Sequence, residues 1–234
     1  MTSVLIVLSA SDHWTLSTGD KYPTGVWAEE LVEPHRLFTD ARYDITIATP
    51  GGVAPTFDQN SLSARGAGSE ERVEELRTYL DSIATELKSP VPLTDVTVAD
   101  FDVVFYPGGH GPMEDLSVDA DSGRIMTEAL ASGRPLGVLC HAPAAMFAAV
   151  AADGSWPFTG YRMTGFSDAE EELNGLAEVA PWLVETRLVS NGAIYSKAAE
   201  PFGSHVVVDR NLYTGQNPAS SAAAAKQIIA ALAE

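Results

Sequence analysis

The chain has 234 residues, 45% of them hydrophobic, which is enough apolar material for a substantial buried core. Its 32 acidic and 14 basic residues give a formal net charge of −18, which argues against nucleic acid and anionic membrane surfaces as partners. Cys140 is the only cysteine, so an intrachain disulfide and a multi-cysteine metal site are excluded.

Strand and helix patterns alternate along the chain, beginning with the apolar run 4–8. This run is too short to span a bilayer and follows no basic leader, so we expect a cytoplasmic protein in which the thiol stays reduced. Further strands are predicted at 44–48, 103–106, 136–139, 206–208 and 212–214. Helices are predicted at 26–38, 70–87, 122–131, 143–151, 169–176, 181–190 and 218–233.

This alternation predicts an α/β fold of the doubly wound kind, with a mostly parallel sheet and helices on both faces. We expect a single domain over residues 1–234, in which residues 57–97 are an elaboration on the core.

The segment around Cys140 carries the strongest chemical signal. The predicted strand 136–139 leads directly into Cys140 and His141, and Pro143 opens the predicted helix. Cys140 is therefore expected on a strand-turn-helix nucleophile elbow, where the helix N-terminus lowers a thiol pKa. The alternative is a buried structural cysteine beside a surface histidine, and the strand-turn-helix context favours the nucleophile.

A glycine turn, Gly108-Gly109-His110, follows the predicted strand 103–106. Turns at the carboxyl ends of parallel strands form the ligand crevice, so this turn should lie beside Cys140. Its spacing matches no phosphate-binding motif. We expect the N–H groups of Gly109 and His141 to form an oxyanion hole, with Gly108 and His110 lining the pocket. A tight turn that needs positive φ is compatible with the same glycines.

Glu30 interrupts an otherwise apolar helical stripe, formed by Trp27, Glu30, Leu31, Pro34, Leu37 and Phe38. A carboxyl on a buried face has a raised pKa, which suits a general acid or base. If the helical phase differs by one position, Glu29 or Glu33 faces inward instead.

His141 needs an acid to orient it, and the candidates are Asp168, Glu170, Glu171 and Glu172. Acids at a helix start are usually solvated, so we expect at least two of the four to lie in solvent. No metal-ligand spacing stands out, and we expect neither a metal nor a cofactor.

Five segments resemble the ThiJ/PfpI superfamily, which is related in fold to class I glutamine amidotransferases. The similarity is greatest to its branch of glutathione-independent glyoxalase III and heat-shock chaperone proteins. The segments span residues 24–34, 106–111, 138–143, 164–171 and 214–220.

The resemblance implies a flavodoxin-like fold, a homodimer and a role in stress response. It also implies that Cys140 is the nucleophile, His141 its catalytic partner, Glu171 the acid completing the triad, and Glu30 the acid that hydrogen-bonds the cysteine. Two departures stand out, because Ala142 replaces a usual glycine and Glu33 replaces a histidine or aromatic residue.

These expectations favour a cofactor-free enzyme that converts methylglyoxal, a small aldehyde, to lactate through a hemithioacetal on Cys140. One alternative is an amidase or peptidase that uses the same cysteine. Another is a stress-response chaperone or redox sensor in which Cys140 is oxidised.

Overall fold

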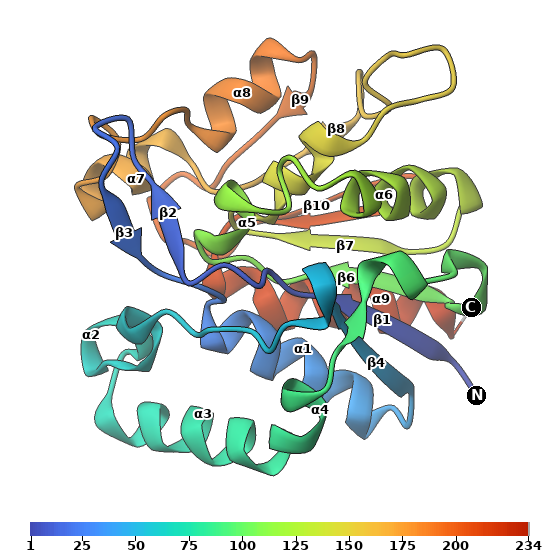
Figure 1. The fold of residues 1–234 in the computed structure, drawn as a ribbon, viewed down its shortest axis with the longest axis horizontal. Helices are drawn as coiled ribbons and strands as arrows, with labels where there is room; N and C mark the ends of the chain where they lie inside the picture. The colour runs from blue at the N-terminus through green and yellow to red at the C-terminus, as the bar shows by residue number, and fades with distance from the viewer. Residues whose placement is uncertain (234) are drawn as a thin grey trace.

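A seven-stranded sheet separates two layers of helices in the computed structural model, which describes residues 1–233 (Figure 1). The strand order is β10-β11-β7-β6-β1-β4-β5, and all neighbours are parallel except the antiparallel pair β10–β11. The strands are β1 (Ser3–Val7), β4 (Asp44–Thr49), β5 (Val91–Pro92), β6 (Val103–Tyr106), β7 (Leu136–Leu139), β10 (Val206–Asp209) and β11 (Leu212–Gly215). The six predicted strands agree with these bounds to within one residue.

The central strands are buried on both faces, as a sheet covered on both sides requires. In β1, Val4 and Ile6 pack into one core, whereas Leu5 and Val7 pack into the other. The first core contains residues of α1 (Ala28–Asp40) and α9 (Ser221–Leu232). The second contains residues of α5 (Gly111–Glu114) and α6 (Ala120–Ser132). The fold is therefore the doubly wound α/β fold that the sequence predicts.

Several predicted helices differ in detail: the one expected at 181–190 begins at Val184, and the one expected at 218–233 opens with the 3-10 turn Pro218–Ser220 before α9. The segment 70–87 divides at Ile83 into α3 (Glu70–Ser82) and α4 (Ala84–Lys88). The segment after the elbow is a 3-10 helix, η5 (Ala142–Ala148), rather than an α-helix. The other helices are α2 (Ala64–Ala67), α7 (Asp168–Asn174), α8 (Val184–Ser190) and the short 3-10 helices Pro50–Gly52, Gln59–Leu62, Leu93–Asp95, Val98–Asp100 and Pro218–Ser220.

Two small two-stranded sheets were not predicted. One is the hairpin of β2 (His13–Thr15) and β3 (Lys21–Pro23), and the other pairs β8 (Arg162–Met163) with β9 (Ile194–Tyr195). Strands of two or three residues are too short to show a period in sequence. Within the described chain, none of the helices combines the length and the apolar character needed to cross a membrane.

Candidate active site

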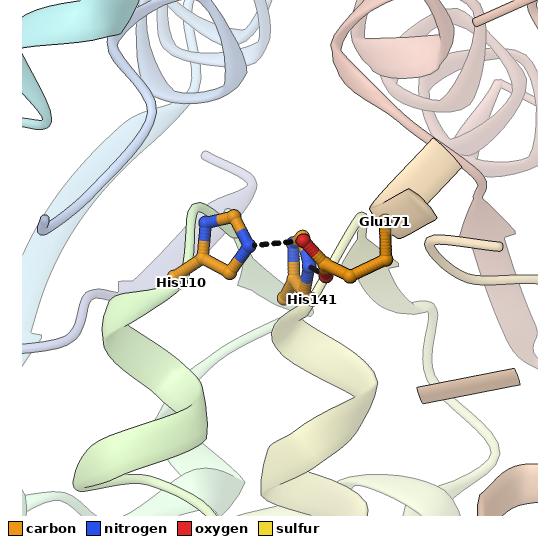
Figure 2. A group of neighbouring side chains, drawn as sticks. All are labelled: His110, His141 and Glu171. Carbon is orange, nitrogen blue, oxygen red and sulfur yellow. Dashed lines mark hydrogen bonds and ion pairs between the residues drawn. The ribbon is translucent and has the colours of Figure 1, made fainter. Parts of the chain in front are cut away.

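Four segments bring polar side chains together at the carboxyl ends of β6 and β7. The loop after β6 supplies His110, the elbow after β7 supplies Cys140 and His141, α1 supplies Glu30 and α7 supplies Glu171. All five side chains are buried. Figure 2 shows the carboxylate of Glu171 reaching the rings of both His110 and His141.

The turn at Cys140 has the backbone of a nucleophile elbow. Its φ is 57°, in the left-handed region that non-glycine residues rarely adopt. The Cys140 N–H donates to Gly215 O at 2.8 Å, and Phe166 N–H donates to Cys140 O at 2.8 Å. These two bonds hold the strained conformation in place. Ala142 begins η5 without positive φ, so alanine is harmless at that position.

Cys140, His141 and Glu171 form a continuous relay. The Cys140 Sγ lies 3.2 Å from His141 Nδ1, and His141 Nε2 lies 2.6 Å from Glu171 Oε2. The second oxygen, Oε1, lies 2.9 Å from His110 Nε2. The structure thus brings together the three residues that the sequence singled out and adds His110, which the sequence placed only in the pocket lining.

The electrostatics of the relay leave His141 neutral at pH 7. Burial and the neighbouring His110 lower the pKa of His141 to about 4, although Glu171 acts to raise it. Burial acts to raise the pKa of Glu171, but the two histidines together lower it below its ordinary value. The ionised carboxylate therefore accepts the Nε2–H of His141, and this leaves Nδ1 as an acceptor for the Cys140 thiol proton.

Glu30 lies inside the protein, as the helical phase predicts, with Glu29 and Glu33 only partly buried. Its Oε2 accepts the Gly108 N–H at 2.8 Å, while its buried Oε1 has no hydrogen-bond partner among the described residues. Burial raises the pKa of Glu30 to about 8, against opposing contributions from the Cys140 thiol and the Gly108 amide. A carboxyl that holds or releases a proton near neutral pH thus lies beside the sulfur.

The expected low pKa of Cys140 is wrong for this structure. Burial and the adjacent Glu30 raise the pKa of the thiol, and the Gly109 N–H opposes them only in part. The helix expected to stabilise a thiolate is the short 3-10 segment η5, which offers a small dipole. The sulfur is therefore a thiol at rest and needs a base within the site.

The glycine loop must approach the elbow closely. A Cβ on Gly108 would lie 2.6 Å from Leu139 O and 2.9 Å from Glu30 Oε2, so a larger residue would displace the acid or the strand end. Gly109 has a φ of 92°, which requires glycine. Its N–H faces the Cys140 sulfur and is suitably placed for an oxyanion formed there.

The four acids of the run 168–172 are buried to different extents from those expected. Glu172 is exposed, and the half-buried Asp168 accepts a hydrogen bond from the Thr186 hydroxyl at 2.5 Å. Glu170 is fully buried, although the sequence suggested that at least two of the four acids lie in solvent. Its carboxylate accepts hydrogen bonds from neighbouring loops, so that suggestion is wrong.

Glu33 does not reach the site. It accepts a hydrogen bond from Arg36 on its own helix and pairs with Arg72 of α3. At this departure from the resembled branch, the acid therefore joins α1 to α3.

Aromatic rings that sequence reasoning missed surround the histidines. Trp14 stacks on His110 with centroids 5.2 Å apart, and Tyr22 meets the same ring in a T-shaped contact with centroids 6.1 Å apart. Phe166 stacks on His141 at 4.2 Å. Trp14 and Tyr22 belong to the β2–β3 hairpin, so only a prediction of that hairpin would have revealed them.

The ligand atoms of His110, His141 and Glu171 all lie within 4.8 Å of one another. This donor set, two imidazoles and a carboxylate, is one that divalent transition metals accept. In the structure the same atoms hydrogen-bond one another, so a cation would compete with the proton relay.

Comparisons with known proteins show which proteins this chain resembles. Residues 23–231 match the model of the DJ-1/PfpI family. Glutamine amidotransferase-like class 1 domain-containing protein 1 of Bos taurus is 32% identical, covering 88% of this chain and 87% of the relative. Glyoxalase 3 of Candida albicans is 27% identical, covering 99% of this chain and 98% of the relative.

Two solved structures are similar to the chain over nearly its whole length. The crystal structure of glyoxalase III from Candida albicans has a TM-score of 0.85 at 26% identity and covers 98% of this chain and 97% of its own. The structure of Rapid Encystment Protein 24 KDa from Francisella tularensis has a TM-score of 0.87 at 30% identity and covers 99% of both chains.

Proposed function

The chain belongs to the DJ-1/PfpI family, and from that premise we propose that it is a cofactor-free enzyme that converts methylglyoxal and related 2-oxoaldehydes to 2-hydroxy acids. The observation that carries this proposal is the relay of Cys140, His141 and Glu171 with Glu30 beside the same sulfur. The relay supplies a nucleophile and a base, and Glu30 supplies a second proton carrier. Relatives named glyoxalase 3 and glutathione-independent glyoxalase support this choice of substrate.

The first step is addition of the Cys140 sulfur to the aldehyde carbon, C1. A carbon–sulfur bond forms while the thiol proton passes to His141 Nδ1, which lies 3.2 Å from the sulfur. Glu171 stabilises the resulting imidazolium through its bond to Nε2. The oxygen of the hemithioacetal is held by the N–H groups of Gly109 and His141.

The second step moves a proton from C1 to C2 through an enediol, with Glu30 or His141 as the carrier. C1 is oxidised to the thioester level while the ketone carbon C2 is reduced to an alcohol, so the step needs no external oxidant. Water then hydrolyses the thioester and releases lactate and the free thiol. The net reaction adds one water to methylglyoxal.

The burial of the sulfur supports a small substrate over a peptide. Cys140 is 3% exposed and His141 is 1% exposed. A three-carbon aldehyde reaches such a site with little displacement of the protein, whereas an extended peptide requires an open groove. This favours the aldehyde reaction over the amidase alternative.

The test measures lactate from methylglyoxal without glutathione, for the wild-type protein and for Cys140→Ser. We expect turnover by the wild type and its loss in the variant, because a hydroxyl is a much poorer nucleophile at this position. Exposed Glu172→Gln serves as the control that retains activity. Absence of lactate from the wild type, or undiminished lactate from Cys140→Ser, would contradict the proposal.

A further inference from the structure

Five aromatic rings follow one another through the site. The successive centroids of Trp14, His110, His141, Phe166 and Phe202 are 5.2, 3.9, 4.2 and 6.2 Å apart. The first four residues are at most 5% exposed, whereas Phe202 is 45% exposed. The row therefore meets solvent at Phe202.

The backbone of Phe202 is held in an unfavourable conformation. Its φ is 61°, a value that large side chains rarely adopt. Its N–H donates to Glu170 Oε1 at 2.8 Å, and Asn217 Nδ2 ties the next residue by donating to Gly203 O at 2.8 Å. Such strain persists only where the surrounding structure enforces it.

Glu170 is a buried hub for this loop. Besides Phe202 N–H, its carboxylate accepts Ser167 N–H and Oγ–H at 2.9 and 2.7 Å, Gln216 Nε2 at 2.9 Å and Asn217 Nδ2 at 2.8 Å. Five donors saturate a carboxylate, which has only acceptors to offer. Glutamine would turn its NH₂ group toward donors and lose part of this network.

We propose that Phe202 is a specificity-determining residue that limits the size of molecules reaching Cys140, and that Glu170 is a positioning residue that holds its ring at the opening. The buried sulfur needs a route to solvent, and because Phe202 is the one well-exposed ring of the row, we place that route beside its side chain. Because Glu170 fixes the Phe202 backbone, the ring stays anchored beside Phe166, and its bulk excludes large groups. The size limit itself is independent of the chemistry at the sulfur, while its relevance to aldehydes rests on the proposed function.

The first experiment measures alkylation rates with iodoacetamide and with the bulkier N-benzyl iodoacetamide. Cys140 is the only cysteine, so each rate reports on it alone. Phe202→Gly removes the ring and relieves the positive φ, so it should fold. We expect the bulky-to-small rate ratio to rise about 10-fold or more, the scale on which a filled pocket rejects extra groups.

Matched variants distinguish the effect of the Phe202 ring from the effect of Glu170, which holds its backbone. Phe202→Tyr keeps the ring and should leave the ratio unchanged, as should Glu172→Gln on the exposed side of α7. Glu170→Gln should raise the ratio in the same direction as Phe202→Gly, measured where circular dichroism shows the variant to be folded, because an unfolded chain would also lose the size limit. An unchanged ratio in Phe202→Gly would overturn the proposal. Tyr22→Ala tests the β2–β3 hairpin as the alternative opening, and a rise in the ratio seen only in that variant would also overturn the proposal.

The second experiment compares kcat/KM for phenylglyoxal and methylglyoxal. Phe202→Gly and Glu170→Gln should both shift this selectivity toward phenylglyoxal. If the wild type turns over neither aldehyde, the proposed function fails, and the alkylation ratio still decides whether Phe202 limits access. If both aldehydes are substrates and neither ratio moves, the inference fails and the proposed function stands.

Discussion

The Cys140 sulfur lies between two groups that can each exchange a proton with it at neutral pH. His141 is a neutral imidazole with a free acceptor toward the sulfur, and Glu30 is a buried carboxyl with a pKa of about 8. A carboxylate and a thiolate cannot both be charged in so small a buried space, so the last proton belongs to the pair. Under the proposed function, activation of the thiol depends on whether His141 or Glu30 takes that proton when substrate binds.

The first prediction concerns this pair. The alkylation rate of Cys140 should have a pH midpoint above that of a free thiol, about 8.5, because burial and Glu30 both raise its pKa. Glu30→Gln should lower the midpoint, since it removes a negative charge beside the sulfur. The measurement is the rate of iodoacetamide labelling against pH, with Glu172→Gln as control. A wild-type midpoint below that of a free thiol would contradict the role given to Glu30.

A second prediction concerns stability at Glu30. Its pKa rises from 4.5 to about 8 on folding, so the folded protein retains a proton that the unfolded chain releases. The associated stability is present below pH 4.5 and is lost as the pH rises to 8, a loss of about 3–5 kcal/mol. Glu30→Gln should remove this loss, because an amide does not titrate.

Urea unfolding at pH 5 and pH 8 measures this effect directly. The variant should gain stability relative to the wild type as the pH rises, while its turnover falls about 10²-fold, the scale of a positioned acid or base. If the free energy of unfolding changed equally with pH in the wild type and in Glu30→Gln, Glu30 would not be protonated inside the folded protein.

The third prediction concerns Glu171, whose two oxygens serve two histidines. In Glu171→Gln one of those oxygens becomes an NH₂ group, which cannot accept an N–H, so His141 or His110 loses its partner. We expect turnover to fall about 10²-fold or more, because the neutral His141 is no longer held in the required tautomer. The measurement is the steady-state rate, and the control Glu172→Gln should have a rate close to that of the wild type. Equal activity in the two variants would assign the orientation of His141 to another residue.

At the scale of elements, the site depends on how the β6 loop fits against the β7 elbow and α1. The Trp27 N–H donates to Gly108 O at 3.0 Å, and the Gly108 N–H donates to Glu30. One loop residue thus joins the start of α1 to the acid that α1 carries. Gly108 has no space for a side chain at this junction.

The fourth prediction tests that junction with Gly108→Ala. The added Cβ would meet backbone at 2.6 Å and the Glu30 carboxyl at 2.9 Å, so we expect activity to fall at least about 10²-fold and stability by about 1–3 kcal/mol. Gly133→Ala, at the end of α6, is the control. Its Cβ meets no atom within 4 Å, although its φ is 73°, so it should lose stability but not activity. Turnover and thermal unfolding measured on both variants distinguish the two effects.

At the scale of the molecule, two cores hold the sheet rigid while its carboxyl edge carries the chemistry. Strands β6 and β7 are neighbours in register, Tyr106 opposite Val138, so the loops that follow them emerge side by side. This is the position at which parallel α/β sheets bind ligands. Helix α1, which packs on one face of the sheet, adds Glu30, and α7 adds Glu171.

The fifth prediction is that activity survives dialysis against a chelator, because the protein groups themselves supply the nucleophile and the proton carriers. Added Zn²⁺ should inhibit reversibly, since His110, His141 and Glu171 offer ligand atoms within 4.8 Å of one another and a cation there displaces the relay protons. The assay follows lactate before and after dialysis and during a zinc titration. Activity lost on dialysis and restored by zinc would show a metal-dependent reaction.

The sequence by itself determined the features that local patterns encode. The apolar runs of β6 and β7 end where predicted, so the elbow at Cys140 and the glycine loop could be located before the fold was known. Helical phase pointed Glu30 inward, with Glu29 or Glu33 as the alternative, and the family resemblance agreed with Glu30. Family resemblance, rather than spacing, selected Glu171 from its neighbours.

Only the tertiary structure decided what depends on contacts between distant segments. The pKa of Cys140 rises because α1 places Glu30 against it, and no local pattern near residue 140 records that contact. Glu170 is buried because the loops around Phe202 and Gln216 close over it, whereas the acidic run by itself suggested a solvated helix start. Trp14 and Tyr22 reach His110 from a hairpin whose strands are too short to show a sequence period. Burial and charge in this site are properties of segments that meet only in the folded chain, and those properties set its chemistry.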